Sequence, residues 1–145
     1  MRALGVPARE NVALARQVTR FQPLLVVVAN AGLLARVQAR LRGAGVDMGR
    51  IRLLVADYDD TWLRDSGPIT QRAVDRFRLL DFRFTGWGGK FGASRDDLLV
   101  EHLAAQGLFG ASERRRIDFA LEGGAIEIDG NGTLDLYVCN NRNDD

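Results

Sequence analysis

The chain has 145 residues, 46% of them hydrophobic and 27% charged, with a formal net charge of +1. These values exclude a disordered or fibrous chain and give no electrostatic reason to expect nucleic acid or an anionic membrane as a partner. A single cysteine, Cys139, excludes an internal disulfide, and the longest apolar run, 24–29, is far shorter than the roughly 20 residues that cross a bilayer, so we expect a cytoplasmic protein.

The first half of the sequence predicts helices and buried strands in alternation. Apolar residues at helical spacing predict an amphipathic helix over 8–20. The valine-rich run 24–29 is typical of a strand that is buried on both faces. The helical pattern returns over 33–41, and a second buried strand is predicted over 52–56.

The second half adds a further helix and several short strands. Alternating apolar and polar residues predict a strand over 77–85. A helix is predicted over 96–106, with Ser94 as its candidate N-cap. Short strands complete the pattern, at 117–121, 125–128 and 134–138. We interpret the whole chain, 1–145, as one domain of the α/β class.

The densest group of acidic residues follows the second buried strand. Asp57, Asp59, Asp60 and Asp65 fall within nine residues, with Arg64 as one internal partner. Ligand sites in α/β proteins favour the loops after the carboxyl ends of strands. Crowded carboxylates repel one another unless cations or hydrogen bonds compensate, so the segment is a candidate socket for a cationic substrate or a metal. The alternative is a solvated turn in which aspartates cap their own backbone.

Three further residues carry the chemistry that a planar cation would need. Trp62 precedes Asp65 by three positions, and an indole face beside a carboxylate suits a guanidinium that stacks on one and hydrogen-bonds to the other. Trp87 lies in the glycine-rich segment GWGGKFG, which does not match a phosphate-binding loop. Glu122 precedes two glycines at the end of a predicted strand. For each of these residues, a structural role remains an alternative.

Taken together, four segments resemble the agmatine deiminases and their bacterial peptidylarginine deiminase relatives. In chain order they are DDTWLRDSGP, DFRFTGWGGK, LEGGAIEIDGNGTL and NRN. The resemblance implies the five-bladed α/β propeller of guanidine-modifying enzymes, with this chain supplying about two ββαβ blades. It also implies hydrolysis of a guanidinium, such as agmatine to N-carbamoylputrescine and ammonia, with no metal or organic cofactor. The implied partner is a small-molecule guanidine substrate.

The resemblance also assigns roles to individual residues. Asp65 matches the carboxylate that grips the guanidinium nitrogens, and Glu122 matches an active-site acid. The residues that it places around the substrate are Trp62, Asp60, Arg64 and Trp87, with Asp59 as a further motif residue.

The sequence departs from the family pattern in its catalytic residues. The family's histidine lies in a His-x-Asp motif downstream of NRN, and its nucleophilic cysteine lies near the far C-terminus. His102 and Cys139 match neither position. We therefore expect an N-terminal fragment that binds guanidines weakly, does not turn them over alone, and self-associates through uncovered strand edges. The tail of the substrate is not predicted.

Two other interpretations of the sequence stay open. LLVADYDDTWL also resembles the signature of haloacid-dehalogenase phosphatases, in which Asp57 would accept the phosphoryl group and Asp59 would act as general acid with Mg²⁺. That interpretation leaves WLRDSGP and LEGG without a role. The third interpretation is a non-catalytic, vestigial protein that binds guanidinium groups.

Overall fold

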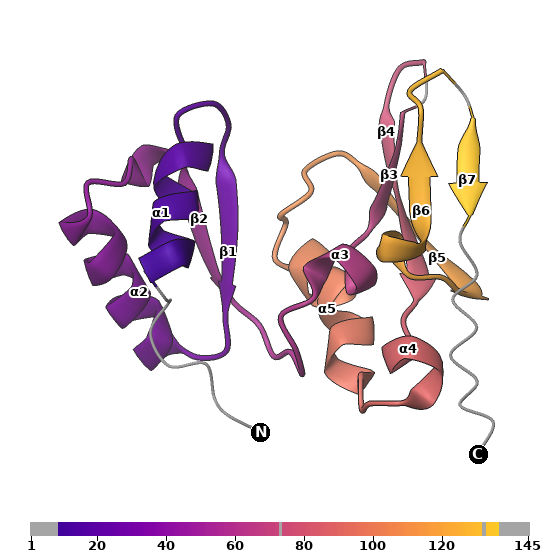
Figure 1. Ribbon diagram of the computed structural model, residues 1–145, viewed down its shortest axis with the longest axis horizontal. Helices are drawn as coiled ribbons and strands as arrows, with labels where there is room; N and C mark the ends of the chain where they lie inside the picture. Colours follow the sequence, from indigo (N-terminus) through magenta and orange to yellow (C-terminus); the bar gives the residue numbers. More distant parts are fainter. Residues whose placement is uncertain (1–8, 73, 132, 137–145) are drawn as a thin grey trace. The chain divides into compact units, whose positions relative to one another are not determined.

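The structure, a computed structural model, describes residues 9–72, 74–131 and 133–136 (Figure 1). The chain divides into two compact units, Met1–Asp57 and Tyr58–Asp145. Both combine helices with β-strands, which confirms the α/β class expected from the sequence. No helix in the described ranges is both long and apolar enough to cross a membrane.

The first unit places two helices against a two-stranded parallel sheet. Its elements are α1 (Arg9–Val18), β1 (Leu24–Val28), α2 (Ala31–Gly43), the 3₁₀ turn η1 (Met48–Arg50) and β2 (Ile51–Val55). The register of the two strands aligns Leu24 with Ile51. One core joins both helices to the sheet, through Ala15, Val28, Val37, Leu41 and Val46. The two strands and two helices predicted for this half are confirmed.

The second unit contains a ββαβ arrangement followed by a hairpin. Its elements are α3 (Leu63–Ser66), β3 (Ile69–Arg72), β4 (Phe77–Arg83), α4 (Gly86–Gly89), α5 (Ser94–Ala105), β5 (Glu113–Ala120), the 3₁₀ turn η2 (Gly123–Ala125), β6 (Ile126–Ile128) and β7 (Leu134–Leu136). The strand β4 pairs antiparallel with β3 and parallel with β5, and α5 makes the crossover between the parallel pair (Figure 1). β6 and β7 form a separate antiparallel sheet.

Charged residues hold α5 to the three-stranded sheet. Asp81 of β4 is only 2% exposed and accepts hydrogen bonds from Arg114 at 2.7 Å and Arg116 at 3.2 Å, both on β5. Arg114 also donates a hydrogen bond to Glu101 at 3.0 Å, and Arg116 donates one to Asp97 at 2.6 Å; both acceptors are on α5. A buried carboxylate needs such partners, so two members of the arginine run on β5 are structural.

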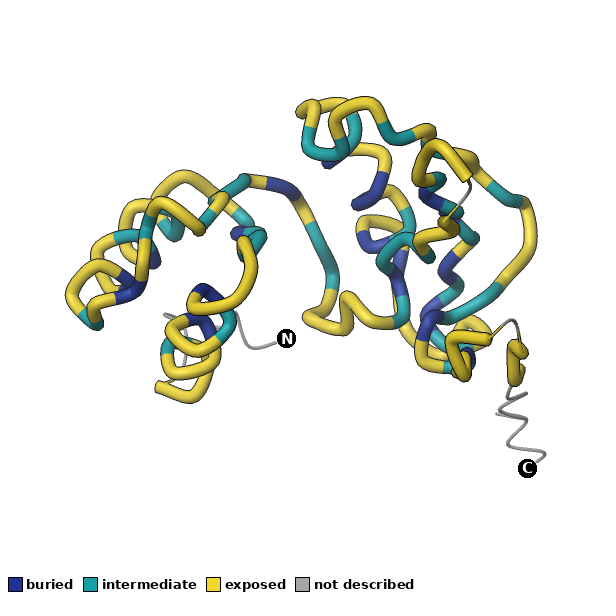
Figure 2. The backbone as a smooth tube through the Cα atoms, turned by 90° about the horizontal axis from the view of Figure 1, so that it is seen from above, coloured by how far each residue is buried: buried dark blue, intermediate teal, exposed yellow. Residues whose placement is uncertain are grey.

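The helix α5 differs from its prediction at its first turn. It begins at Ser94, which was expected to be the N-cap, and the N-cap position is Ala93 without a side-chain hydrogen bond. The carboxylate of Asp59 instead accepts the backbone N–H of Arg95 at 2.9 Å. Asp59 therefore supplies the hydrogen bond that a local capping side chain would normally provide. The buried residues of the helix lie three and four positions apart on one face, at Asp96, Leu99, Val100 and Leu103. Figure 2 shows such buried positions in dark blue among exposed ones along the backbone.

The β6–β7 hairpin turns at Asp129, whose carboxylate accepts the backbone N–H groups of Asn131 at 2.7 Å and Thr133 at 3.1 Å. The hydrogen bond from Asn131 contributes most to holding the pKa of Asp129 below its usual value. Opposite each other in the hairpin, Ile128 and Leu134 stay 68% and 60% exposed. The strand was predicted to run to 138, but positions after 136 lie outside the described residues.

Candidate functional site

The carboxylate of Asp65 lies at the centre of the candidate site. Asp65 belongs to the single helical turn α3 and is half-buried. Its Oδ1 accepts the backbone N–H of Gly124 at 3.0 Å, and its Oδ2 accepts the indole N–H of Trp87 at 3.3 Å. Each carboxylate oxygen can accept about two hydrogen bonds. Both oxygens of Asp65 therefore keep capacity for a further donor.

Trp87 reaches Asp65 from a turn with an unusual backbone. Its φ of 60° and ψ of 55° lie in the left-handed region, which a bulky side chain rarely adopts. The preceding Gly86 also has a positive φ, of 66°, and a Cβ at that position would collide with the backbone oxygen of Phe91. The indole packs edge-on against Phe84 and Phe91, with ring centroids 5.2 and 5.7 Å away. Packing on both sides fixes the ring where its N–H meets Asp65.

Glu122 is the second carboxylate of the site. Burial raises its pKa above the usual value, the negative charge of Asp65 raises it further, and a hydrogen bond from the backbone of Trp87 opposes both effects. The two acids are far apart in the sequence, yet each is in hydrogen-bond contact with Trp87 and they repel each other. A bound cation would relieve that repulsion.

The two glycines after Glu122 allow the chain to approach α3 closely. A Cβ on Gly123 would collide with the backbone oxygen of Arg64, and a Cβ on Gly124 would collide with Oδ1 of Asp65. A side chain at either position is incompatible with this contact. The EGG sequence is therefore explained as a close approach of η2 to the turn that carries Asp65.

The remaining predicted residues have other partners. Arg64 donates to the backbone oxygen of Ile126 at 3.3 Å and lies 3.5 Å from Glu127, so it links α3 to β6. Asp60 accepts the backbone N–H of Thr61 at 2.7 Å and shapes the turn before α3. The side chains of Arg64 and Asp60 therefore have structural roles.

Three of the predicted residues lie outside the group formed by Asp65, Trp87 and Glu122. Trp62 is 60% exposed, and its backbone oxygen accepts the N–H of Asp65 at 3.1 Å. Asp59 caps α5, as described above. Asp57 is exposed at the end of the first unit. Among the described side chains, no group of three or more His, Cys, Asp or Glu is placed to hold a metal ion.

Of the two residues that match neither catalytic motif of the family, one is described by the structure. His102 is exposed in the last turn of α5. Cys139 lies outside the described residues.

Sequence reasoning missed two acids at the start of α5. The carboxylate of Asp96 is 4% exposed and accepts the backbone N–H groups of Asp59 at 2.8 Å and Asp60 at 3.1 Å. Burial raises the pKa of Asp96, and these two hydrogen bonds oppose the rise. The carboxylate of Asp97 accepts the backbone N–H of Phe84 at 2.6 Å. Both acids lie in the helix predicted from the sequence, where neither was given a role of its own.

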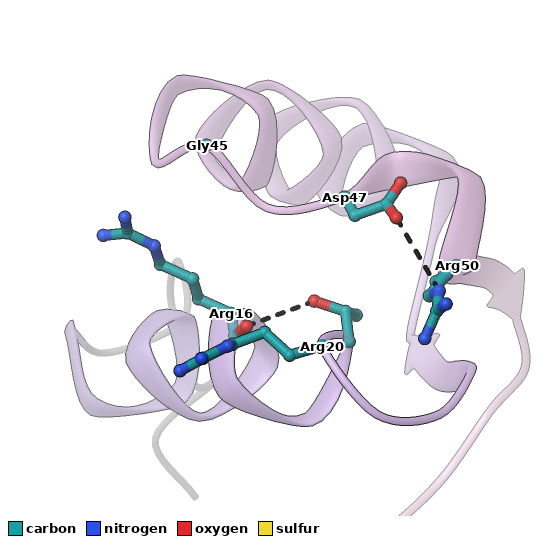
Figure 3. Close-up of a pocket in the computed structure, with 6 residues that line it drawn as sticks. Arg16, Arg20, Gly45, Asp47 and Arg50 are labelled. Atoms are coloured by element: carbon teal, nitrogen blue, oxygen red, sulfur yellow. Dashed lines mark hydrogen bonds and ion pairs between the residues drawn. The ribbon is translucent and has the colours of Figure 1, made fainter.

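The first unit carries a hollow of about 380 Å³ with the opposite electrostatic character. It is lined by Arg16, Thr19, Arg20, Gly45, Asp47 and Arg50 (Figure 3). Three arginines outnumber the one acid, and that acid lies 3.8 Å from Arg50. Positive charge repels a guanidinium, so this hollow does not fit the cation that suits the site around Asp65.

Comparison with a solved structure identifies the class of fold. A cysteine-to-serine variant of C. jejuni agmatine deiminase with substrate bound superposes with a TM-score of 0.74 at 27% sequence identity, over 87% of this chain and 35% of that one. The chain therefore has the mixed α/β fold found in deiminases.

Sequence comparison then gives the family. The model of the Porphyromonas-type peptidyl-arginine deiminases matches residues 3–145, and the chain belongs to that family. The agmatine deiminase of Pseudomonas aeruginosa strain LESB58 is 36% identical over 96% of this chain, and that of Pseudomonas fluorescens strain Pf-5 is 33% identical over 96%. The chain spans about 39% of the length of these relatives.

The family membership confirms the resemblance drawn from the four sequence segments. It gives no support to the phosphatase interpretation, in which Asp59 would be a general acid. The structure gives that carboxylate a different task, at the N-terminus of α5.

Proposed function

We propose that this chain carries the guanidinium-gripping part of a deiminase active site whose substrate is agmatine. In this proposal Asp65 and Glu122 are the catalytic carboxylates, and Trp87 orients Asp65 through its indole N–H. The exposed ring of Trp62 adds a stacking face, while Asp60 and Arg64 shape the surrounding turn. The agmatine deiminases among the relatives support agmatine over other guanidines.

One observation carries the proposal. Two carboxylates from distant segments converge on Trp87, and Asp65 raises the pKa of Glu122. The free energy of this arrangement improves when a cation binds between the acids. A guanidinium has planar N–H groups that match the carboxylate fork, whereas an ammonium acts as a point charge. The charge and the geometry therefore favour a guanidinium.

The reaction implied by the family is hydrolysis, in which water enters and ammonia leaves as the guanidinium becomes a urea group. In this proposal Asp65 holds the guanidinium nitrogens through the free capacity of its two oxygens. Glu122 stabilises positive charge on the same group. The sequence has no residues matching the family's His-x-Asp motif or its nucleophilic cysteine. We propose that the 145-residue chain binds agmatine weakly and does not turn it over.

The architecture belongs to the same proposal. The observed order β3, β4, α5, β5 is a ββαβ unit, the building block of the five-bladed propeller expected from the sequence. We propose that both units of this chain are parts of one such propeller domain and contribute about two of its blades.

Binding of agmatine to the 145-residue chain tests the proposal. We expect the indole N–H resonance of Trp87 to shift in an NMR titration with agmatine, with a Kd in the millimolar range, about −4 kcal/mol. Putrescine, which has an amine in place of the guanidinium, is the matched ligand control and should bind far more weakly. Equal responses to agmatine and putrescine would count against a guanidinium site.

Two variants test the residue assignment. Asp65→Asn removes the charge that grips the cation and should weaken agmatine binding about 10- to 100-fold, the value of a charge-assisted hydrogen bond. Asp75→Asn is the control, because Asp75 is 77% exposed and its recorded partner is the neighbouring Arg76 at 3.6 Å. Unchanged agmatine binding by Asp65→Asn would refute the role of Asp65. Release of ammonia by the pure chain would refute the proposed lack of turnover.

A further inference from the structure

Two segments must be held in place for the candidate site to exist. One is the turn 58–62, which leads into α3 and Asp65. The other is the end of β4, which leads into the turn that carries Trp87. The two segments are separated in sequence by β3 and most of β4, and the first turn of α5 contacts both of them.

The first turn of α5 touches the first of these segments through Asp96. Its buried carboxylate accepts the N–H of Asp59 on Oδ1 at 2.8 Å and the N–H of Asp60 on Oδ2 at 3.1 Å. In return, Asp59 accepts the N–H of Arg95 at 2.9 Å. The contact is therefore reciprocal: α5 orders the turn before α3, and that turn caps α5.

The next residue, Asp97, touches the second segment. Its Oδ1 accepts the N–H of Phe84 at 2.6 Å, and its Oδ2 receives Arg116 from β5 at 2.6 Å. Phe84 is 4% exposed and packs edge-on against the indole of Trp87. A chain of direct contacts thus runs from Asp97 through Phe84 to the indole that donates to Asp65.

We infer that Asp96 and Asp97 are positioning residues of the guanidinium site, which fix the Asp65 turn and the Trp87 turn against one helix. Neither carboxylate reaches the proposed substrate, and both act through the backbone groups that they hold. The adjacency of the two residues explains how one rigid element aligns two segments. The inference rests on the proposed function for its consequence in binding, although the alignment itself can be measured without a ligand.

Asp96→Asn and Asp97→Asn test the alignment with little change of shape. At position 96, asparagine offers one acceptor oxygen to two N–H groups that now use both carboxylate oxygens. At position 97, the NH₂ group of asparagine would face the guanidinium of Arg116, and two donors cannot hydrogen-bond to each other. We expect both variants to shift the indole N–H resonance of Trp87 in the ligand-free chain, and Asp75→Asn to leave it unchanged.

The second measurement is agmatine affinity, taken where circular dichroism shows each variant to be folded. Misalignment of Asp65 and Trp87 should lower the affinity for agmatine roughly tenfold. If Asp96→Asn fails to fold, Asp59→Ala is a milder variant. It removes the hydrogen bond from the N–H of Arg95 to Asp59, which belongs to the same contact between α5 and the turn 58–62, and the Asp59 side chain is partly exposed. It should shift the same resonance.

The outcomes separate the two proposals. A wild-type chain without any response to agmatine refutes the proposed function. Variants that bind agmatine like the wild type, or that leave the Trp87 resonance at its wild-type position, overturn the positioning role. A shifted resonance with reduced agmatine affinity supports it.

Discussion

The substitution Gly124→Ala is the sharpest test of the close approach between η2 and α3. An alanine Cβ would lie against Oδ1 of Asp65, inside the 3.0 Å at which real Cβ contacts essentially end. The aspartate side chain is short, so it can yield only by leaving its hydrogen bonds to Gly124 and Trp87.

The size of the effect follows from those two hydrogen bonds. At 3.0 and 3.3 Å, and partly exposed, each belongs near the lower end of the 1.5–3 kcal/mol typical for a charged acceptor. The loss of one or both costs about 1.5–3 kcal/mol, and restricting the unfolded chain by replacing glycine returns about 0.4–1 kcal/mol. We therefore expect the free energy of unfolding to fall by about 1–2 kcal/mol.

The matched control is Gly92→Ala. Gly92 is exposed, has no positive φ, and has nothing within 4 Å of the added Cβ. It should leave stability unchanged or raise it slightly, so the two alanine variants are expected to differ in sign.

Urea denaturation followed by circular dichroism gives both values from the shift in midpoint at constant slope. Guanidinium chloride is unsuitable, because its cation is the proposed ligand. If Gly124→Ala is as stable as Gly92→Ala, the close approach of η2 to the Asp65 turn is refuted.

Three further outcomes are expected. Because burial and Asp65 raise the pKa of Glu122, its contribution to stability is present at low pH and is lost as the pH rises from the usual glutamate value through the raised pKa; urea titrations should show that Glu122→Gln removes this fall. Asp81→Asn should cost about 3 kcal/mol in the same assay, the lower end for breaking a buried ion pair because its arginine partners stay partly exposed. We expect the chain to self-associate through the exposed pair Ile128 and Leu134, and therefore to sediment as a concentration-dependent oligomer. Leu134→Lys should make it monomeric. A wild-type chain that stays monomeric at all concentrations would contradict this expectation.

The regular elements were predictable because their signals are local. The apolar run of β1 and the helical spacing in α1 and α2 appear in the sequence at nearly the observed bounds. The short elements α3 and α4 were not predicted, since one helical turn has no periodicity to detect. The strand β5 begins four residues before its predicted start at 117, because Arg114 is held in the sheet by the buried Asp81 rather than by hydrophobicity.

The candidate site shows a similar division between local and long-range information. Asp65, Trp87 and Glu122 stood out by residue type and by the family resemblance, and the structure brings them together. The positions of Asp96 and Asp97 could not be predicted, because their partners are backbone N–H groups 13 to 37 residues away. A hydrogen bond to a distant backbone leaves no pattern in the side chains around it.

The left-handed backbone of Trp87 has a consequence for engineering and evolution. A bulky residue in this region costs about 1–2 kcal/mol relative to glycine, whereas the packing of the indole against Phe84 and Phe91 favours the tryptophan. Replacement by glycine would relieve the backbone but would remove the indole N–H that donates to Asp65. A library sorted for agmatine capture should therefore keep the tryptophan at this position, although its backbone conformation would suit glycine better.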